Sequence, residues 1–284
     1  MNKGVVFSVL SAFAFSIQNV IVKTLSVTIG TGEIVFFRGF ITAIFIFVLM
    51  RARHIQFSHC DRPELIFRGL AGAAGLCCNF YALKKLPLAD VSILAQSTGF
   101  FVIIFAFIFL HERLKLGALV PLVIIVFGVS LVIRPWDLAS FNRYSLLMLI
   151  YGICCAAVYT TISRLTRTGR HHEYEIVIYF MIASAITGFM LMLDNFTWPG
   201  RFEGSVLLCL GLVTVVAQTL MTLGYKYGDP VIVTFAAYVA VIFDMTFGYV
   251  LFDETVGILS LFGGVLIIGG TMYLTRLKEN NGIC

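Results

Sequence analysis

Residues 99–112 read GFFVIIFAFIFLHE and residues 241–254 read VIFDMTFGYVLFDE, two apolar stretches that lie 142 positions apart. The same register aligns further residues of the two halves: Lys84 with Lys226, Phe101 with Phe243, Phe105 with Phe247, Glu112 with Glu254, Gly128 with Gly270 and Arg134 with Arg276. The offset is half of the 284 residues. The sequence therefore predicts a duplication, with one copy at 1–142 and the second at 143–284.

The composition indicates a membrane protein. Apolar residues make up 60% of the chain and charged residues 12%, with a mean hydropathy of +0.97, whereas a soluble domain has about 25% charged residues. A helix needs about 20 apolar residues to cross a bilayer. Such stretches occur at 4–25, 32–50, 66–84, 88–110, 116–133, 144–164, 174–193, 204–226, 229–251 and 258–275. We expect an all-α integral membrane protein with ten transmembrane helices.

The number of stretches per copy determines the symmetry. Each half holds five, and an odd number of crossings leaves the second copy upside down relative to the first. The expected architecture is therefore two inverted five-helix repeats, through which many secondary transporters obtain alternating access.

Lysine and arginine in the short loops predict the orientation. If the N-terminus is cytoplasmic, the outer side holds Lys23, Lys84, Lys85, Arg134, Arg143 and Arg201, and Arg38 lies within a segment. The other 13 of the 20 basic residues, Arg68 among them, then lie inside. This bias predicts a multi-pass protein of the cell inner membrane with both termini cytoplasmic. The net charge of +5 follows from this topology, and we expect no nucleic-acid partner.

Asp244 is the outstanding ionisable residue within a segment. An acid at the bilayer centre costs roughly 2.5–3.5 kcal/mol, so it faces protein or water and usually has a function. Its counterpart in the other copy is Val102, which argues against a symmetric structural role. Asp244 is expected to bind a cationic group of the substrate or a coupling proton; the alternative is a carboxylate satisfied by a neighbouring helix.

Other polar residues fall within the segments. Asn19 and Gln218 belong to stripes at helical spacing, which we expect to line a water-filled cavity rather than a helix contact. Arg38 reaches the outer interface in one interpretation, and in the other it faces the cavity and binds a carboxylate or phosphate. Weaker candidates for the substrate site are Asn79, Tyr81, Gln96, Tyr159 and Tyr238.

Signatures of enzymes are missing from the sequence. His111–Glu112 and His172–Glu173 begin like a zinc protease motif, but no second histidine follows at the required position. His171, His172 and Glu173 are expected to be solvated loop residues rather than metal ligands. We therefore expect no catalytic residue, no metal and no cofactor.

One group of motifs identifies a family resemblance. Residues 79–90 read NFYALKKLPLAD and 109–113 read FLHER, while 223–230 read LGYKYGDP and 251–254 read LFDE. Over nearly its whole length the chain resembles the drug/metabolite transporter superfamily, in its EamA-like branch. The resemblance implies a cavity lined by helices 1–4 and 6–9, with the fifth and tenth peripheral. Arg38 and Arg164 match arginines of the family. Prolines that the family places midway in helices four and nine are absent, so we expect the fourth to bend at Gly99.

These observations predict an inner-membrane secondary transporter that moves a small organic metabolite, an amino-acid-like zwitterion or an organic cation, by alternating access. A carrier of S-adenosylmethionine, a vitamin or an organic anion would use the same fold. An alternative of another class is a membrane scaffold or sensor that transports nothing. The expected partners are the substrate and the bilayer, with protons as a candidate coupling ion, and the chain is either a monomer or a homodimer.

Overall fold

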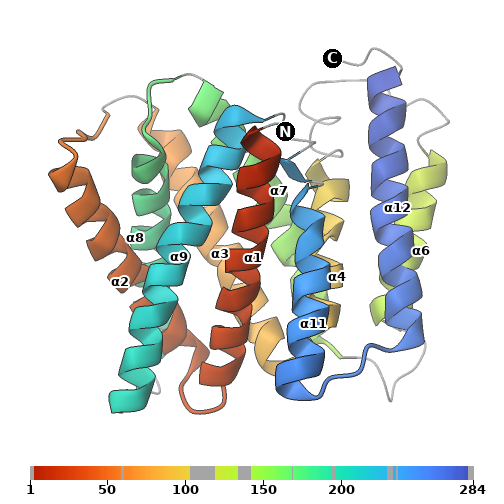
Figure 1. Ribbon diagram of the computed structural model, residues 1–284, viewed down its shortest axis with the longest axis horizontal. Helices are drawn as coiled ribbons and strands as arrows, with labels where there is room; N and C mark the ends of the chain where they lie inside the picture. Colours follow the sequence, from red (N-terminus) through yellow and green to blue (C-terminus); the bar gives the residue numbers. More distant parts are fainter. Residues whose placement is uncertain are drawn as a thin grey trace.

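The computed structural model describes residues 3–58, 61–102, 119–133, 142–167, 169–193, 196–228, 233–234 and 236–280. No strand occurs in these residues, and their regular elements are helices (Figure 1). The elements are α1 (Lys3–Leu25), α2 (Thr31–Ala52), α3 (Arg62–Lys85), α4 (Leu88–Ala95), α6 (Leu119–Ile133), α7 (Tyr144–Arg167), α8 (Glu173–Met192), α9 (Arg201–Tyr227), the 3₁₀ helix η2 (Ala237–Val239), α11 (Ala240–Phe252) and α12 (Ile258–Asn280).

The ends of several helices follow from local chemistry. Pro63 lies in the first turn of α3, where its missing N–H leaves no hydrogen bond unmade. Pro87 directly precedes α4 and disfavours helical geometry in the residue before it. At the start of α8, Nδ1 of His172 accepts a hydrogen bond of 3.2 Å from the backbone N–H of Tyr174.

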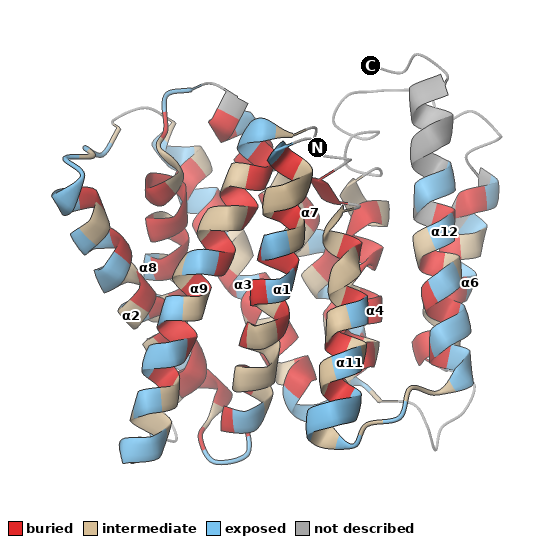
Figure 2. Ribbon diagram, viewed as in Figure 1, coloured by how far each residue is buried: buried red, intermediate tan, exposed pale blue. Residues whose placement is uncertain are grey.

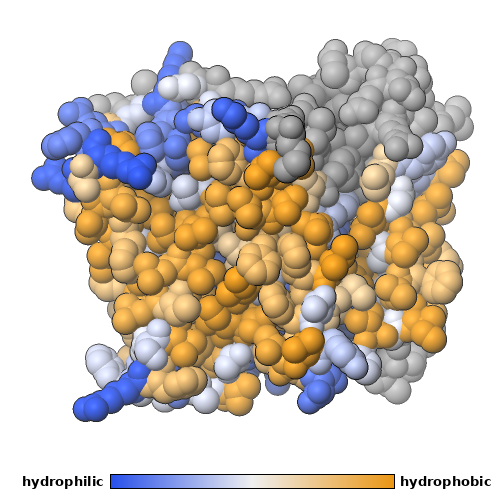
Figure 3. Space-filling view, in the orientation of Figure 1, coloured by the Kyte–Doolittle hydropathy of each residue, from blue (hydrophilic) through white to orange (hydrophobic). Residues whose placement is uncertain are grey.

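The described helices suit a bilayer. Six of them, α1, α2, α3, α7, α8 and α9, are long and apolar enough to cross a membrane. Shorter apolar helices occupy Leu88–Val102, Val123–Ile133, Ala237–Phe252 and Ile258–Gly270, within or overlapping predicted segments. An apolar belt lies between hydrophilic ends (Figure 3), and buried residues face inward while exposed ones face outward (Figure 2). The protein is a multi-pass membrane protein.

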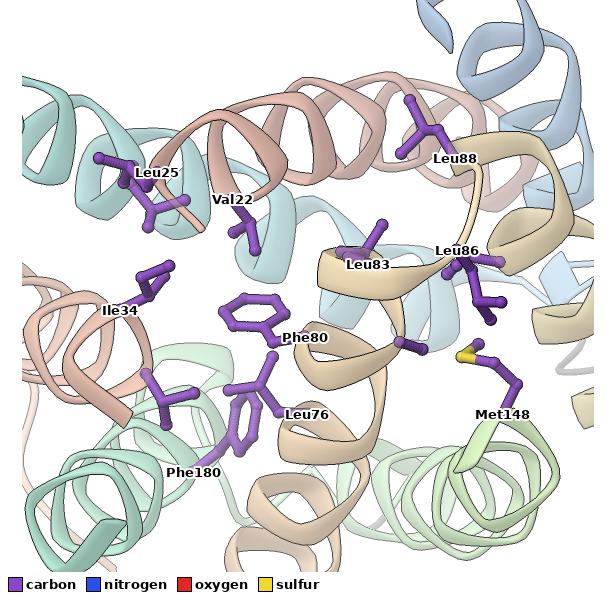
Figure 4. Packing of buried hydrophobic residues seen from close by; sticks show 14 of the residues in the cluster. Val22, Leu25, Ile34, Leu76, Phe80, Leu83, Leu86, Leu88, Met148 and Phe180 are labelled. Carbon is purple, nitrogen blue, oxygen red and sulfur yellow. The ribbon is translucent and has the colours of Figure 1, made fainter. Parts of the chain in front are cut away.

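Helices from the two halves of the chain pack against one another. The closest associations join α2 with α8, α1 with α9, α6 with α12 and α3 with α7, followed by α3 with α8 and α2 with α9; α4 also contacts α11. Leu76 and Phe80 of α3 and Phe180 of α8 point towards one another in the main apolar cluster (Figure 4). Each half therefore depends on the other for its core.

The contact between α2 and α8 is close because glycine lies on both helices. A Cβ at Gly39 would stand 2.7 Å from the backbone nitrogen of Ala185, and a Cβ at Gly188 would stand 2.7 Å from Cα of Phe36. Small residues let helix backbones approach in this way in membrane proteins.

Two helices are interrupted in the middle of the bundle. α4 ends at Ala95, Gln96 forms a turn, and the chain is helical again over 97–102. In the second half the 3₁₀ turn of η2 precedes α11. The expected bend at Gly99 is therefore wrong in position, because the break falls at Gln96. The carbonyl of Gln96 accepts from the N–H of Gly99 at 3.2 Å and from the hydroxyl of Tyr238, which satisfies the backbone at the break.

Candidate functional site

A cavity of about 170 Å³ lies in the middle of the bundle. Its lining comes from α1, α2, α3, α4, α7, α8, α9, residues 233–234, η2 and α11. Among the described residues neither α6 nor α12 contributes to it. This arrangement agrees with the resemblance, which implied a cavity lined by eight helices with the fifth and tenth at the periphery.

Most of the candidate substrate-site residues meet at this cavity. Its lining includes Asn19, Arg38, Asn79, Gln96, Tyr159, Gln218, Tyr238 and Asp244. Tyr81 is not in the described lining. Residues two positions apart on a helix point about 200° apart, so Tyr81 cannot share the face of Asn79.

Asp244 is buried, with 1% of its surface exposed. Nδ2 of Asn19 donates a hydrogen bond of 3.4 Å to its Oδ2. Its Oδ1 has no hydrogen-bond partner within the described part of the chain. The hydroxyls of Ser92 and Ser16 are the other polar neighbours of the carboxylate.

Two fully buried arginines also line the cavity. Arg38 is 0% exposed; its Nε donates to Oε1 of Gln18 at 3.3 Å, and its guanidinium carbon lies 5.5 Å from the ring centre of Phe180. Arg68 is 1% exposed; its Nη2 donates to Oε1 of Gln218 at 3.3 Å, and its guanidinium carbon lies 4.2 Å from the same ring. Arg38 therefore faces the cavity and does not reach the outer interface.

Sequence reasoning missed several polar residues of the cavity, and Arg68 is the charged one among them. It was counted among the cytoplasmic loop charges, which leaves 12 of the 20 basic residues inside once it is removed. The spacing of residues in the sequence could have placed Arg68 on the same face of the helix as Asn79. The face consists of Arg68, Gly72, Leu76 and Asn79, and all four line the cavity. Gln18 on α1 was overlooked in the same way.

A charged network joins three segments at the end of the bundle where α1 finishes. Lys23 forms an ion pair with Glu254, and its Nζ also donates to the carbonyl of Leu86 at 2.9 Å. The second oxygen of Glu254 accepts from the backbone N–H of Leu88 at 2.7 Å. These contacts link α1, the connection from α3 to α4, and the segment after α11.

The expectation of a solvated loop around His171 is wrong. Its side chain is 0% exposed and lies between two carboxylates, with Nδ1 3.0 Å from Glu175 Oε2 and Nε2 3.3 Å from Asp61 Oδ2. Asp61 is distant in sequence, so local pattern gave no sign of this burial. No cluster suited to holding a metal ion occurs among the described residues.

Comparisons with known proteins agree with this architecture. The model of the EamA-like transporter family matches residues 2–134 and 143–276. A solved structure with a TM-score of 0.63 and 17% identity covers 96% of the chain, and the chain covers 98% of it, which shows the fold. The chain is 35% identical to the pseudopaline exporter CntI of Pseudomonas aeruginosa over 98% of both chains. It is 23% identical to an S-adenosylmethionine uptake transporter of Rickettsia bellii, over 95% of this chain and 92% of the relative.

A riboflavin transporter of Brucella anthropi is 28% identical over 74% of this chain and 75% of its own. All these named relatives are carriers of small metabolites, and none is an enzyme. The chain belongs to the EamA-like transporter family and is a membrane transporter of small metabolites.

Proposed function

We propose that this protein is an inner-membrane secondary transporter that moves a small zwitterionic metabolite by alternating access. The observation that carries the proposal is that one cavity is lined by both an acidic and two basic side chains. Asp244 offers a carboxylate oxygen, while Arg38 and Arg68 offer buried N–H donors. Buried charged groups of this kind favour a ligand with both a cationic and an anionic group.

The helix pairing supports ten helices in two inverted repeats. In the register of 142 residues, α1 and α9 correspond to α7 and α3, and both pairs are in contact. Two further pairs, α2 with α8 and α6 with α12, correspond to themselves. A two-fold axis in the membrane plane requires such a pattern, in which every contact either has a partner contact or crosses the axis.

The orientation is proposed with both termini in the cytoplasm. The start of α1 and the end of α12 lie at the same end of the bundle (Figure 1), as an even number of crossings requires. The basic residues of the loops, even without Arg68, favour this end as the cytoplasmic one.

Export is the proposed direction of transport. The pseudopaline exporter is 35% identical over 98% of the chain, whereas the S-adenosylmethionine uptake transporter is 23% identical over 95%. A substrate that is only cationic fits the cavity poorly, because the two buried guanidinium groups would repel it. Pseudopaline is therefore the first compound to test.

Asp244 is proposed to receive the cationic group of the substrate or the coupling proton. The two roles predict different outcomes for Asp244→Asn. Loss of gradient-driven transport with exchange retained would indicate proton coupling, and loss of both would indicate direct binding. No effect on either would contradict both roles.

The first experiment is thermal stabilisation of the purified protein. A panel of pseudopaline, S-adenosylmethionine, riboflavin and amino acids is added to the wild type and to Asp244→Asn. A ligand at about 100 times its dissociation constant adds roughly 2.7 kcal/mol to the free energy of unfolding. We expect a zwitterion to raise the melting temperature of the wild type and to do so less in the variant. If no small metabolite raises it, and none crosses inverted vesicles that contain the protein, the proposal is wrong.

A further inference from the structure

The charges of the cavity do not balance. Arg38 and Arg68 form no ion pair within the described part of the chain. Nη1 and Nη2 of Arg38, and Nε and Nη1 of Arg68, have no hydrogen-bond acceptor in these residues either. Two buried cations thus face one buried carboxylate, that of Asp244.

Such an arrangement is costly unless a ligand compensates it. A buried charge without a partner carries a penalty of several kcal/mol, and each unmade hydrogen bond adds to it. Buried charged groups without a partner are characteristic of binding sites, where the ligand supplies the missing partner.

The surroundings hold both guanidinium groups in fixed positions. Oε1 of Gln18 accepts from Arg38 and also from Oγ1 of Thr214 at 3.0 Å, so the amide is itself anchored. Both guanidinium groups lie over the ring of Phe180. Since each lies within 5.5 Å of that ring centre, the two are close enough to bind one small molecule together.

Gly72 supplies the space for the second arginine. A Cβ at this position would stand 2.8 Å from Nη1 of Arg68 and 2.8 Å from Cδ2 of Phe180. The absence of a side chain thus permits Arg68 to lie against the aromatic ring at the cavity wall.

We propose that Arg38 and Arg68 form a subsite for two carboxylates, so that the substrate is an amino dicarboxylate. This inference rests on the proposed function and specifies its substrate class. The free Nη pair of Arg38 has the geometry of a fork that binds one carboxylate through two hydrogen bonds. Arg68 has two more nitrogens for the second carboxylate. With a cationic amine at Asp244, each charge of the cavity then meets an opposite charge.

The test compares ligands that differ by one carboxylate. Glutamate is compared with glutamine, and iminodiacetate with N-methylglycine, by thermal shift on the full-length protein in detergent. Phosphoserine supplies a dianionic phosphate for comparison. The variants are Arg38→Gln and Arg68→Gln, and Arg164→Gln is the matched control because Arg164 is exposed and pairs with Glu64 outside the cavity.

We expect each dicarboxylate to stabilise the wild type more than its partner does. Either cavity variant should weaken that binding by about tenfold or more, since a hydrogen bond to a charged group contributes roughly 1.5–3 kcal/mol. Arg164→Gln should bind as the wild type does. Removal of an uncompensated charge should also leave the ligand-free variants at least as stable as the wild type, which distinguishes loss of binding from loss of folding.

The possible failures are distinguishable. If glutamine and N-methylglycine stabilise as well as the dicarboxylates, or if phosphoserine is preferred to them, the two-carboxylate subsite is wrong while the transport proposal stands. The same conclusion follows if both arginine variants keep the dicarboxylate preference. If no compound of this panel or of the wider metabolite panel raises the melting temperature, the two-carboxylate subsite is wrong, and if in addition none crosses the inverted vesicles, both proposals fail.

Discussion

The hydroxyl of Tyr238 donates a hydrogen bond of 3.2 Å to the backbone carbonyl of Gln96, and the two residues stand 142 positions apart. Each lies where its helix is interrupted, Gln96 at the turn after α4 and Tyr238 in η2. In the proposed duplication they are counterparts, and counterparts can meet only at the axis that relates the repeats. Both also line the cavity, so the helix breaks and the proposed substrate site lie together.

Replacement of Tyr238 by phenylalanine removes this contact and keeps the ring. The carbonyl of Gln96 then retains only its 3.2 Å bond from the N–H of Gly99. We expect the free energy of unfolding to fall by about 0.5–1.5 kcal/mol, the usual contribution of a neutral hydrogen bond. Melting temperatures measure the effect, and Tyr249→Phe is the control because Tyr249 is 67% exposed. Equal melting temperatures of both variants would contradict the prediction.

The ion pair of Lys23 and Glu254 should contribute more to stability than an ordinary surface pair. The two side chains are only 15% and 18% exposed, so solvent screens their attraction weakly. Glu254→Gln keeps an oxygen for the N–H of Leu88 but removes the charge that faces Lys23. We expect a loss of about 1–2 kcal/mol.

A double-mutant cycle tests this coupling. Lys23→Met alone leaves the carboxylate of Glu254 without its cation, and the double variant leaves neither charge unpaired. We expect a coupling energy above about 0.5 kcal/mol, as for residues in direct contact. Losses that simply add would show that the two side chains act independently.

The close contact of α2 and α8 predicts a strong effect at one glycine. Gly188→Ala places a methyl group against the backbone of Phe36, which cannot move as a side chain can. We expect a loss of about 1–3 kcal/mol from overpacking. At Gly204 nothing lies within 4 Å of the added Cβ, so Gly204→Ala should be neutral or stabilising by up to about 1 kcal/mol. A similar result for both substitutions would show that α2 and α8 can separate freely.

His172 predicts a dependence of stability on pH. Burial lowers its pKa from the ordinary value of 6.5, because the imidazolium loses hydration. Its Nδ1 also accepts a hydrogen bond from Tyr174, which protonation would break. This contribution is therefore complete above pH 6.5 and is lost as the pH falls below that value.

Asparagine in place of His172 separates this effect from other titrations. Asn is a good residue at a helix N-cap and carries no proton in this range. We expect the melting temperature of His172→Asn to fall less than that of the wild type between pH 7.5 and pH 5.5, values chosen on either side of the ordinary histidine pKa. Parallel curves would show that His172 does not contribute to the pH dependence.

The sequence predicts the helices well, because apolar runs of bilayer length have few alternatives. The polar residues Asp244 and Asn19 were also recognisable, since polar groups are expensive in a membrane helix. The sequence did not predict the surroundings of a side chain where these depend on the direction in which it points or on residues distant in the chain. Arg68 lies near a helix end that an apolar run does not define, and His171 is buried by Asp61, whose proximity the sequence does not reveal.

The two proposed repeats share one arrangement of helices, but they contribute different side chains to the cavity. Arg38 corresponds to Phe180, Arg68 to Leu210 and Asp244 to Val102, so each charge has an apolar counterpart. A carrier assembled from two identical half-length chains would present every cavity residue twice, and its substrate would meet the same chemistry at both ends. In the proposed duplication, joining the halves in one chain frees each copy to diverge. The joined chain can then hold a molecule with dissimilar ends in a single orientation.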